Sequence, residues 1–281
     1  MIKQKILQKK TINNIIKDNF RKALSIQFSL GGFSFCISNL ITKEIQHFTV
    51  FSFDEIIDTP ETLLQQIEKL YNENLIVLNQ EFEQVIVIHQ NNLSTLVPTP
   101  LFNEDELSLY LDYNIKTLAN DFIAFDSLSQ LEIKNVYIPY VNINNFFFQK
   151  FGEFEYKHSA TVLIDKLILH SKNNSAKQCF VNVTNNNFDI VIIENSNLLF
   201  YNTFTFTSKE DFIYYILFTA EQLKLNPEEF QLFFIGDIEE ESELYHITYQ
   251  YIRNVNFLET GNTVFNKEQN FSNHSNYLTL P

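Results

Sequence analysis

Few polar side chains in this sequence stand at spacings that could carry out chemistry. The six His residues are dispersed, and His158 and His170 are too far apart in sequence to share a metal ion. Ser29, Ser34 and Thr184 have no His and Asp partners at motif spacing, so a hydrolase triad is not indicated. We therefore predict no catalytic residue and no metal site from these motifs.

Two groups of acidic residues have simpler explanations than catalysis or metal binding. Asp54, Glu55 and Asp58 precede a predicted helix, where negative charge interacts favourably with the helix dipole. The acidic run 239–243 lacks the alternating Asp, Asn and Gly of a calcium loop. We expect it to form a solvated acidic face.

Composition excludes several classes of protein. The chain has 281 residues, of which 45% are apolar and 19% charged, so it can bury a core and is not a disordered solvating chain. The net charge of −14 argues against nucleic-acid binding, which needs clustered Lys and Arg. Cys36 and Cys179 do not make a disulfide framework, and we expect both to be buried free thiols.

The N-terminal region resembles a membrane anchor only superficially. Residues 1–22 form a basic arm, and 23–42 carry no charge. However, Leu24, Ile26 and Phe28 alternate with polar residues, which is typical of a strand and not of a spanning helix. We predict a cytoplasmic protein with no integral membrane segment. The arm either folds back on the acidic body or binds a membrane or RNA.

An internal repeat organises the chain. The first copy comprises strands at 24–30, 33–37 and 44–51, a helix beginning at Thr59-Pro60-Glu61, and a strand at 85–89. The second copy comprises strands at 180–183, 188–193 and 198–206, a helix from Ser208 to about Lys224, and a strand at 232–235. Gln27 and Asn182 occupy equivalent places. We expect positive φ at the first turn of each copy, Gly31-Gly32 and Asn185-Asn186-Asn187.

The segment between the repeats fits neither copy. Its predicted elements are an extended stretch at 92–98, helices at 104–118, 142–151 and 159–170, and strands at 122–125, 133–138 and 153–156. Residues 172–177 are the best linker candidate. The predicted organisation is a basic arm (1–22), a first lobe (23–171) containing an inserted segment (92–158), a second lobe (178–260) and a C-terminal tail (261–281), whose end we expect to dock.

The element order and short hydrophobic patterns resemble a known fold. Val136-Tyr137-Ile138-Pro139, a helix, Gly152, a short strand and a second helix lead into the Asn182 hairpin. This order resembles actin-like pilus-assembly scaffolds and the cell-division actin homologue. Leu24-Ser25-Ile26-Gln27 with Gly31-Gly32-Phe33 looks like an uncharacterised bacterial family with a degenerate version of that fold. The resemblance, over roughly 23–258, implies an α/β chain of two tandem ribonuclease-H-like βββαβ lobes.

The resemblance also implies where a nucleotide would bind, in a cleft between the lobes. The Asp residues that position Mg²⁺ or water in actin-like ATPases map to amides, Gln27 and Asn182. The glycine that follows the second Asp maps to Thr184, and the adenosine loop maps to Gly236 and Asp237, close to the acidic run. The degenerate nucleotide site would thus comprise Gln27, Ser29, Gly31, Gly32, Asn182, Thr184, Asn185, Gly236 and Asp237. We expect no cofactor, with ATP possible but disfavoured.

Three consecutive aromatic residues, Phe146, Phe147 and Phe148, cannot all face one core from one helix. Either that helix is buried on several sides, or one Phe contacts a partner. Our leading hypothesis is a non-catalytic actin-like pseudo-ATPase that binds a protein or peptide as a scaffold. The alternatives are a nucleotide-binding regulator or weak ATPase with a rewired cleft and, least favoured, a self-assembling filament.

Overall fold

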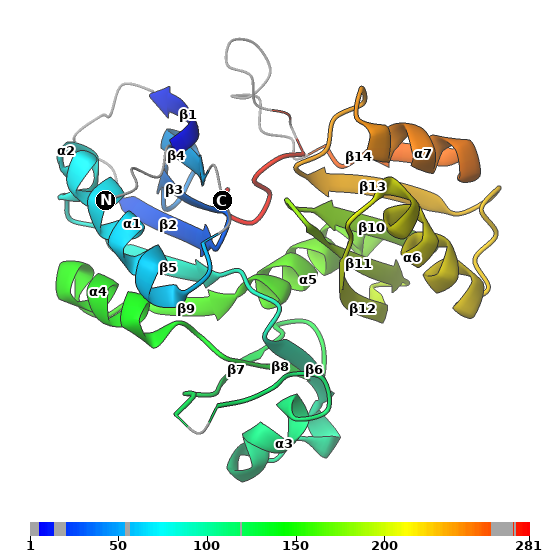
Figure 1. Ribbon diagram of the computed structural model, residues 1–281, viewed down its shortest axis with the longest axis horizontal. Coiled ribbons are helices and arrows are strands. Elements are labelled where there is room, and N and C mark those ends of the chain that lie inside the picture. The colour runs from blue at the N-terminus through cyan, green and yellow to red at the C-terminus, as the bar shows by residue number, and fades with distance from the viewer. Residues whose placement is uncertain (1–5, 14–20, 54–56, 119, 260–271, 273) are drawn as a thin grey trace. The chain divides into compact units, whose positions relative to one another are not determined.

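The computed structural model describes residues 6–13, 21–53, 57–118, 120–259, 272 and 274–281 (Figure 1). Contacts divide the chain into unit 1, Met1–Val162 with Leu278–Pro281, and unit 2, Leu163–Tyr277. The division therefore falls inside helix α5 (Ser159–His170), not at the linker predicted from sequence. Asp54 and Glu55 lie outside the described residues.

Unit 1 contains the first βββαβ repeat. Its larger sheet has the order β1-β4-β3-β2-β5-β9. The strands are β1 (Ile6–Asn13), β2 (Lys22–Ser29), β3 (Gly32–Asn39), β4 (Ile45–Phe53), β5 (Gln84–His89) and β9 (Glu155–His158). Strands β2, β3 and β4 are antiparallel neighbours, while β5 runs parallel to β2. This is the arrangement that the sequence repeat predicts.

Helix α1 (Pro60–Glu73) connects β4 to β5 and shows why the sequence folds in this way. The Thr59 hydroxyl caps its N-terminus by accepting from Thr62 N–H, and Pro60 stands where no backbone donor is needed. A stripe of apolar residues at helical spacing faces the sheet core. Its buried members are Leu63, Ile67, Leu70 and Tyr71, and the short helix α2 (Leu75–Leu78) follows.

Part of the basic arm expected over residues 1–22 is a strand of the first sheet. Strand β1 pairs antiparallel with β4 from Ile6 to Asn13, so this stretch is an edge strand of the sheet. Residues 1–5 and 14–20 lie outside the described part of the chain.

The inserted segment forms a small layer of its own. Strands β6 (Ser94–Pro98), β8 (Ile133–Tyr137) and β7 (Ala124–Ser127) make an antiparallel sheet in that order. The helix expected over 104–118 is much shorter. It consists of a 3-10 turn, η2 (Glu104–Glu106), and α3 (Leu107–Leu111), preceded by η1 (Thr99–Leu101). Beyond it, Asp112 accepts from the Thr117 hydroxyl, a local bond that competes with helix continuation.

The rest of the central segment follows the prediction closely. Helix α4 (Val141–Phe151) ends at Gly152, whose φ of 72° suits glycine, and β9 and α5 follow. A short 3-10 turn, η3 (Ser171–Asn173), precedes unit 2's first strand.

Unit 2 repeats the βββαβ order. Its sheet has the order β12-β11-β10-β13-β14. The elements are β10 (Gln178–Val183), β11 (Asn187–Glu194), β12 (Asn197–Thr205), α6 (Lys209–Gln222), β13 (Gln231–Gly236), α7 (Glu243–Tyr251) and β14 (Asn254–Phe257). Strand β13 is parallel to β10, as β5 is to β2. Ser208 caps α6 by accepting from Asp211 N–H, as the sequence predicts.

Positive backbone φ occurs at a different turn from the one expected. Neither Gly31-Gly32 nor Asn185-Asn186-Asn187 has positive φ. Among the hairpin turns of unit 2, positive φ occurs instead at Asn195 and Ser196, at 51° and 60°, in the tight turn between β11 and β12. Two such residues match the twist of a two-residue hairpin, whereas the longer β10–β11 connection needs none.

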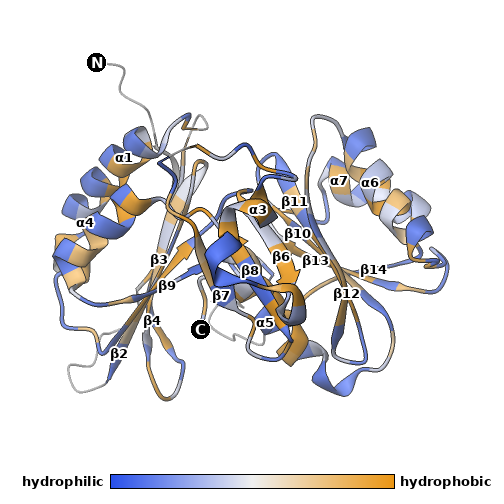
Figure 2. Cartoon of the chain, turned by 90° about the horizontal axis from the view of Figure 1, so that it is seen from below, coloured by the Kyte–Doolittle hydropathy of each residue, from blue (hydrophilic) through white to orange (hydrophobic). Residues whose placement is uncertain are grey.

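The helices pack buried apolar residues against the sheets (Figure 2). Both cysteines, Cys36 and Cys179, are free and buried. Among the described residues, no helix is long and apolar enough to cross a membrane.

Candidate functional site

Gln27 lies on β2 with both ends of its amide occupied. Its Nε2 donates to Gln90 Oε1 at 2.7 Å, and its Oε1 accepts from the Thr279 hydroxyl at 2.6 Å. Because the Thr279 hydrogen goes to Gln27, the Ser34 hydroxyl donates in the 3.0 Å bond between Ser34 and Thr279. The chain's own C-terminal segment is therefore bonded to Gln27, the residue that the resemblance maps to an Asp of actin-like ATPases.

The other predicted site residues of unit 1 shape the turn after β2. The Ser29 hydroxyl accepts from Gly31 N–H at 3.1 Å, and Gly31 O accepts from Phe53 N–H. Gly32 is required by close packing, because a Cβ there would lie 2.7 Å from Phe51 O. This turn is held by the neighbouring strand β4.

Asn182 lies on β10 directly opposite Asp189 of β11. Its Nδ2 donates to Asp189 Oδ2 at 2.9 Å. The amide at position 182 thus has a specific partner: an aspartate here would set two carboxylates against each other. The carboxylate of Asp189, on the neighbouring strand, therefore lies beside Asn182.

Asp189 is surrounded by hydrogen-bond donors. Its Oδ1 accepts from the Thr203 hydroxyl at 2.6 Å and from the Tyr201 hydroxyl at 3.2 Å. Burial raises the pKa of the carboxyl, while the bonds from Thr203, Asn182 and Tyr201 lower it. The carboxylate raises the pKa of Tyr201 further, in addition to the effect of burial.

The remaining predicted residues of unit 2 gather at the ends of β10 and β13. Thr184 donates from its hydroxyl to Asn187 O at 3.0 Å, and Asn185 is exposed. Gly236 has a φ of 87°, and a Cβ there would lie 2.1 Å from Val183 O. Asp237 N–H donates to the same carbonyl at 2.8 Å. Glycine at 236 is therefore required by the fold, with or without a ligand.

The C-terminal segment also covers this part of unit 2. Gly236 N–H donates to His274 O at 3.0 Å. His274 Nε2 donates to Ile238 O at 2.6 Å, and its ring stacks on Phe257 with centroids 4.3 Å apart. Burial lowers the pKa of His274. In the loop that the resemblance maps to adenosine contact, the backbone N–H of Gly236 is thus bonded to the chain itself.

Comparison with known proteins agrees with this architecture. Residues 10–255 match the family described as "Protein of unknown function (DUF3822)". The chain belongs to this family. No curated protein matches the sequence.

Solved structures show that this DUF3822 chain has an actin-like ATPase fold. A Bacteroides thetaiotaomicron protein "with actin-like ATPase fold and unknown function" is 24% identical, with a TM-score of 0.76 over 86% of this chain and 94% of that one. The PilM-PilN type IV pilus biogenesis complex contains a chain 10% identical, with a TM-score of 0.55 over 84% of this chain and 88% of that one. The fold expected from the resemblance is confirmed.

The aromatic cluster of the DUF3822 chain divides between core and surface. Phe146 and Phe147 are buried, and Phe147 packs against Phe28 and Phe151. Phe148 is 62% exposed. The partner-contact hypothesis therefore narrows to Phe148.

A second polar cluster, buried in unit 1, went unnoticed in the sequence. Asp126 accepts from His158 N–H and the Thr161 hydroxyl through Oδ2, and from the Tyr137 hydroxyl through Oδ1. Burial raises the Asp126 pKa and lowers the pKa of His158 to about 3. The pKa of His89 is lowered by burial to about 4. These groups have protein partners throughout, so we assign them to the core.

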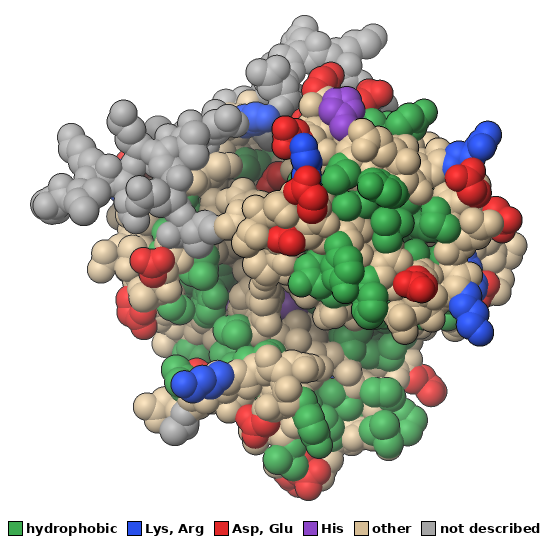
Figure 3. Space-filling view, turned by 45° about the vertical axis from the view of Figure 1, so that its right-hand side comes forward, with side chains coloured by type: hydrophobic (Ala, Val, Ile, Leu, Met, Phe, Trp, Pro, Cys, Tyr) green, Lys and Arg blue, Asp and Glu red, His purple; other side chains and the backbone are tan. Residues whose placement is uncertain are grey.

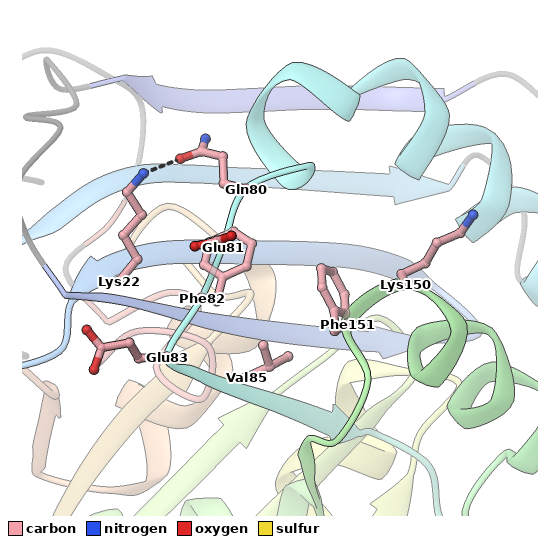
Figure 4. A pocket seen from close by; sticks show the side chains of 8 residues that line it. All are labelled: Lys22, Gln80, Glu81, Phe82, Glu83, Val85, Lys150 and Phe151. Atoms are coloured by element: carbon pink, nitrogen blue, oxygen red, sulfur yellow. Dashed lines mark hydrogen bonds between the residues drawn. The ribbon is translucent and has the colours of Figure 1, made fainter.

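The described surface also has a pocket of about 840 Å³ in unit 1 (Figure 4). Its lining includes Lys22 and Val85, at the starts of the parallel strands β2 and β5, whereas Gln27 lies near the other end of β2. Lys22 donates to Gln80 at 2.7 Å across its rim. None of the predicted site residues lines it. Among the described residues, no group of three or more His, Cys, Asp or Glu could hold a metal ion.

Two important residues escaped sequence reasoning for different reasons. Asp189 had a signal: a hairpin that closes at Val183 and Phe188 places Asn182 opposite Asp189. Thr279 had none, because its contact with Gln27 joins residues 252 positions apart.

Proposed function

We propose that this DUF3822 chain is a non-catalytic actin-like protein that serves as a cytoplasmic scaffold or adaptor for another protein. One observation carries the proposal. Both positions where the fold would place a catalytic Asp hold amides, and each amide is hydrogen-bonded to the chain's own side chains. An amide offers no charge to Mg²⁺ and is not a base, so it cannot take a proton from the attacking water.

The surroundings of these amides further disfavour a nucleotide. The N–H of Gly236 is taken by His274 O, and Glu239 bonds the Ser272 hydroxyl nearby. Glu239, Glu240 and Glu241 are exposed close to this loop. Their negative charge opposes a triphosphate.

The first experiment is a thermal melt with and without Mg-ATP, Mg-ADP and Mg-GTP. A ligand at about 100 times its Kd adds roughly 2.7 kcal/mol, which raises Tm by several degrees for a chain of this size. We expect no nucleotide-specific shift and no phosphate release. A clear shift, with hydrolysis lost on changing Gln27 or Asn182, would instead support the nucleotide-binding regulator.

Exposed apolar side chains on the inserted segment support a role in protein binding. Tyr113 is 90% exposed. Other exposed members are Leu101, Leu109, Leu118 and Phe122. In Figure 3, apolar side chains are visible at the bottom of the view, where Figure 1 places α3. PilM, a neighbour in fold, was solved in complex with PilN.

One core variant and two surface variants separate partner binding from folding. Phe147→Ala opens a cavity in the core and is expected to cost about 3–5 kcal/mol of stability. Phe148→Ala and Tyr113→Ser remove exposed side chains and are expected to leave Tm within about 1 °C. Proteins captured from the native lysate, quantified by mass spectrometry, should be depleted by the surface variants. Capture unaffected by both would contradict a docking surface on this segment.

A further inference from the structure

The C-terminal segment of this chain, Leu278–Pro281, packs on unit 1 as a peptide ligand would. We call the site around Gln27 and Ser34 that holds it the seat. Leu278 and Leu280 are buried, and Thr279 between them is 1% exposed. Contacts assign Leu278–Pro281 to unit 1, although the chain before it, up to Tyr277, belongs to unit 2. The C-terminus lies beside β2 and β3 in Figure 1.

The seat recognises the hydroxyl of Thr279 through two hydrogen bonds. Gln27 and Ser34 are cross-strand partners on β2 and β3, and both bond the Thr279 hydroxyl. That hydroxyl donates at 2.6 Å and accepts at 3.0 Å, so both of its roles are used. A side chain without a hydroxyl would leave Gln27 Oε1 and the Ser34 hydrogen without this partner, which is costly in a buried place.

The orientation of Gln27 is fixed from the other side. Its Nε2 donates to Gln90, so Oε1 must face the tail as an acceptor. Ser34 is itself buried. The fixed acceptor Gln27 Oε1 lies beside the buried Ser34 hydroxyl, with a buried position for one apolar residue on each side. This arrangement favours the pattern apolar–hydroxyl–apolar.

We propose that this seat is a peptide-recognition site of unit 1, that its ligand is a short segment of a partner protein in which Thr or Ser stands between two Leu-sized residues, and that the chain's own Leu278–Pro281 occupies it as an internal competitor. The proposal rests on the proposed scaffold function and names the partner's chemistry. Because the tail is part of the same chain as the seat, its effective concentration there is high, so a partner must also make contacts outside the seat to displace it.

The test uses fluorescent peptides and a chain truncated after Tyr277. The probes are Asn-Tyr-Leu-Thr-Leu-Pro, which is the chain's own residues 276–281, and the same peptide with Val in place of Thr. We expect the truncated protein to bind the Thr peptide at least tenfold more tightly than the Val peptide. The full chain should bind the Thr peptide at least tenfold more weakly than the truncated chain, because its seat is filled.

Two further variants keep the test decisive. Thr279→Val in the full chain retains both leucines but loses the hydroxyl bonds, so it loosens the tail without deleting it and should bind the Thr peptide better than the native chain does. Gln27→Met in the truncated chain should abolish the preference for Thr over Val. Ser25→Ala is the matched control on the same strand.

Several outcomes would overturn the proposal. These are no binding by a truncated or Thr279→Val protein that retains a native melt, equal binding of both peptides, or equal binding by full and truncated chains. Light scattering that shows a dimer of the full chain, lost on truncation, would assign the seat to the tail of a second copy instead. The scaffold proposal is tested separately, by measuring nucleotide binding and hydrolysis.

Discussion

The two units have the same βββαβ arrangement, but the amides at equivalent positions, Gln27 and Asn182, have different hydrogen-bond partners. In unit 1, Gln27 lies between two neutral groups, Gln90 and Thr279. In unit 2, Asn182 is bonded to the carboxylate of Asp189. Gln27 is therefore held by a long-range contact with the tail, whereas Asn182 is held by a charged group on the next strand.

The glycines of the two units differ in a similar way. Gly32 has ordinary φ and only needs space beside Phe51 O. Gly236 needs both space beside Val183 O and a positive φ of 87°. Unit 2 therefore has the more constrained loop.

The largest expected effect compares these glycines. Gly236→Ala places a Cβ 2.1 Å from a carbonyl oxygen and forces a strained φ, so we expect a loss of about 3–5 kcal/mol. Gly32→Ala meets Phe51 O at 2.7 Å without that strain and should cost about 2 kcal/mol. Urea denaturation followed by circular dichroism measures both. Equal losses would show that the two loops are equally constrained.

The next effect tests the charge partner of Asn182. Asn182→Asp sets two carboxylates where one hydrogen bond stood, and we expect a loss of about 3 kcal/mol at pH 7. The double variant Asn182→Asp/Asp189→Asn restores an acid–amide pair and should recover most of that loss. Denaturation of the two single variants and the double variant gives the coupling energy. Additive losses would contradict a direct pair.

Much of the fold could be predicted from sequence because its signals are local. Alternating strands, the Thr59-Pro60 and Ser208 helix starts and the repeat itself gave the βββαβ order of both units. The helix expected over 104–118 was wrong because local side-chain bonds, such as Thr117 to Asp112, compete with the helix. Positive φ was assigned to the wrong turn because loop length, not only residue type, determines turn geometry.

Only part of the candidate site could be predicted, because only part of it depends on local sequence signals. The amides at 27 and 182 follow from the position of each strand in the repeat. The groups that engage them follow from pairing across strands, for Asp189, and from a return of the chain end, for Thr279. Sequence periodicity does not specify that return.

A third effect is the pH dependence of stability that buried groups of unit 1 produce. His89 and His158 in unit 1 are buried, with pKa values of about 4 and about 3. The unfolded chain binds more protons than the folded one below an ordinary His pKa of about 6.5, so stability is complete above that pH and is lost as pH falls toward 4 and 3. From pH 7 to 5 we expect a loss of about 2 kcal/mol for each of these two histidines. Asp126, with a raised pKa, acts in the opposite direction: its contribution is fully present below its unfolded pKa and is lost as pH rises through its raised folded pKa.

Urea denaturation at both pH values measures this loss. His89→Gln should remove about half of the pH dependence, while His246→Gln, at an exposed site in unit 2, should leave it unchanged. A loss that persists in His89→Gln would place the pH-sensitive group elsewhere.

The smallest effect compares the turns that follow β2 and β10. Ser29→Ala removes the acceptor that Gly31 N–H uses, and Thr184→Val removes a donor to Asn187 O. The carbonyl of Asn187 keeps a second bond at 2.9 Å from Thr184 N–H, so its loss is partly covered. We therefore expect about 1 kcal/mol for Ser29→Ala and less than about 0.5 kcal/mol for Thr184→Val, measured by urea denaturation. The reverse order would mean that the turn of unit 2, and not that of unit 1, depends on its hydroxyl.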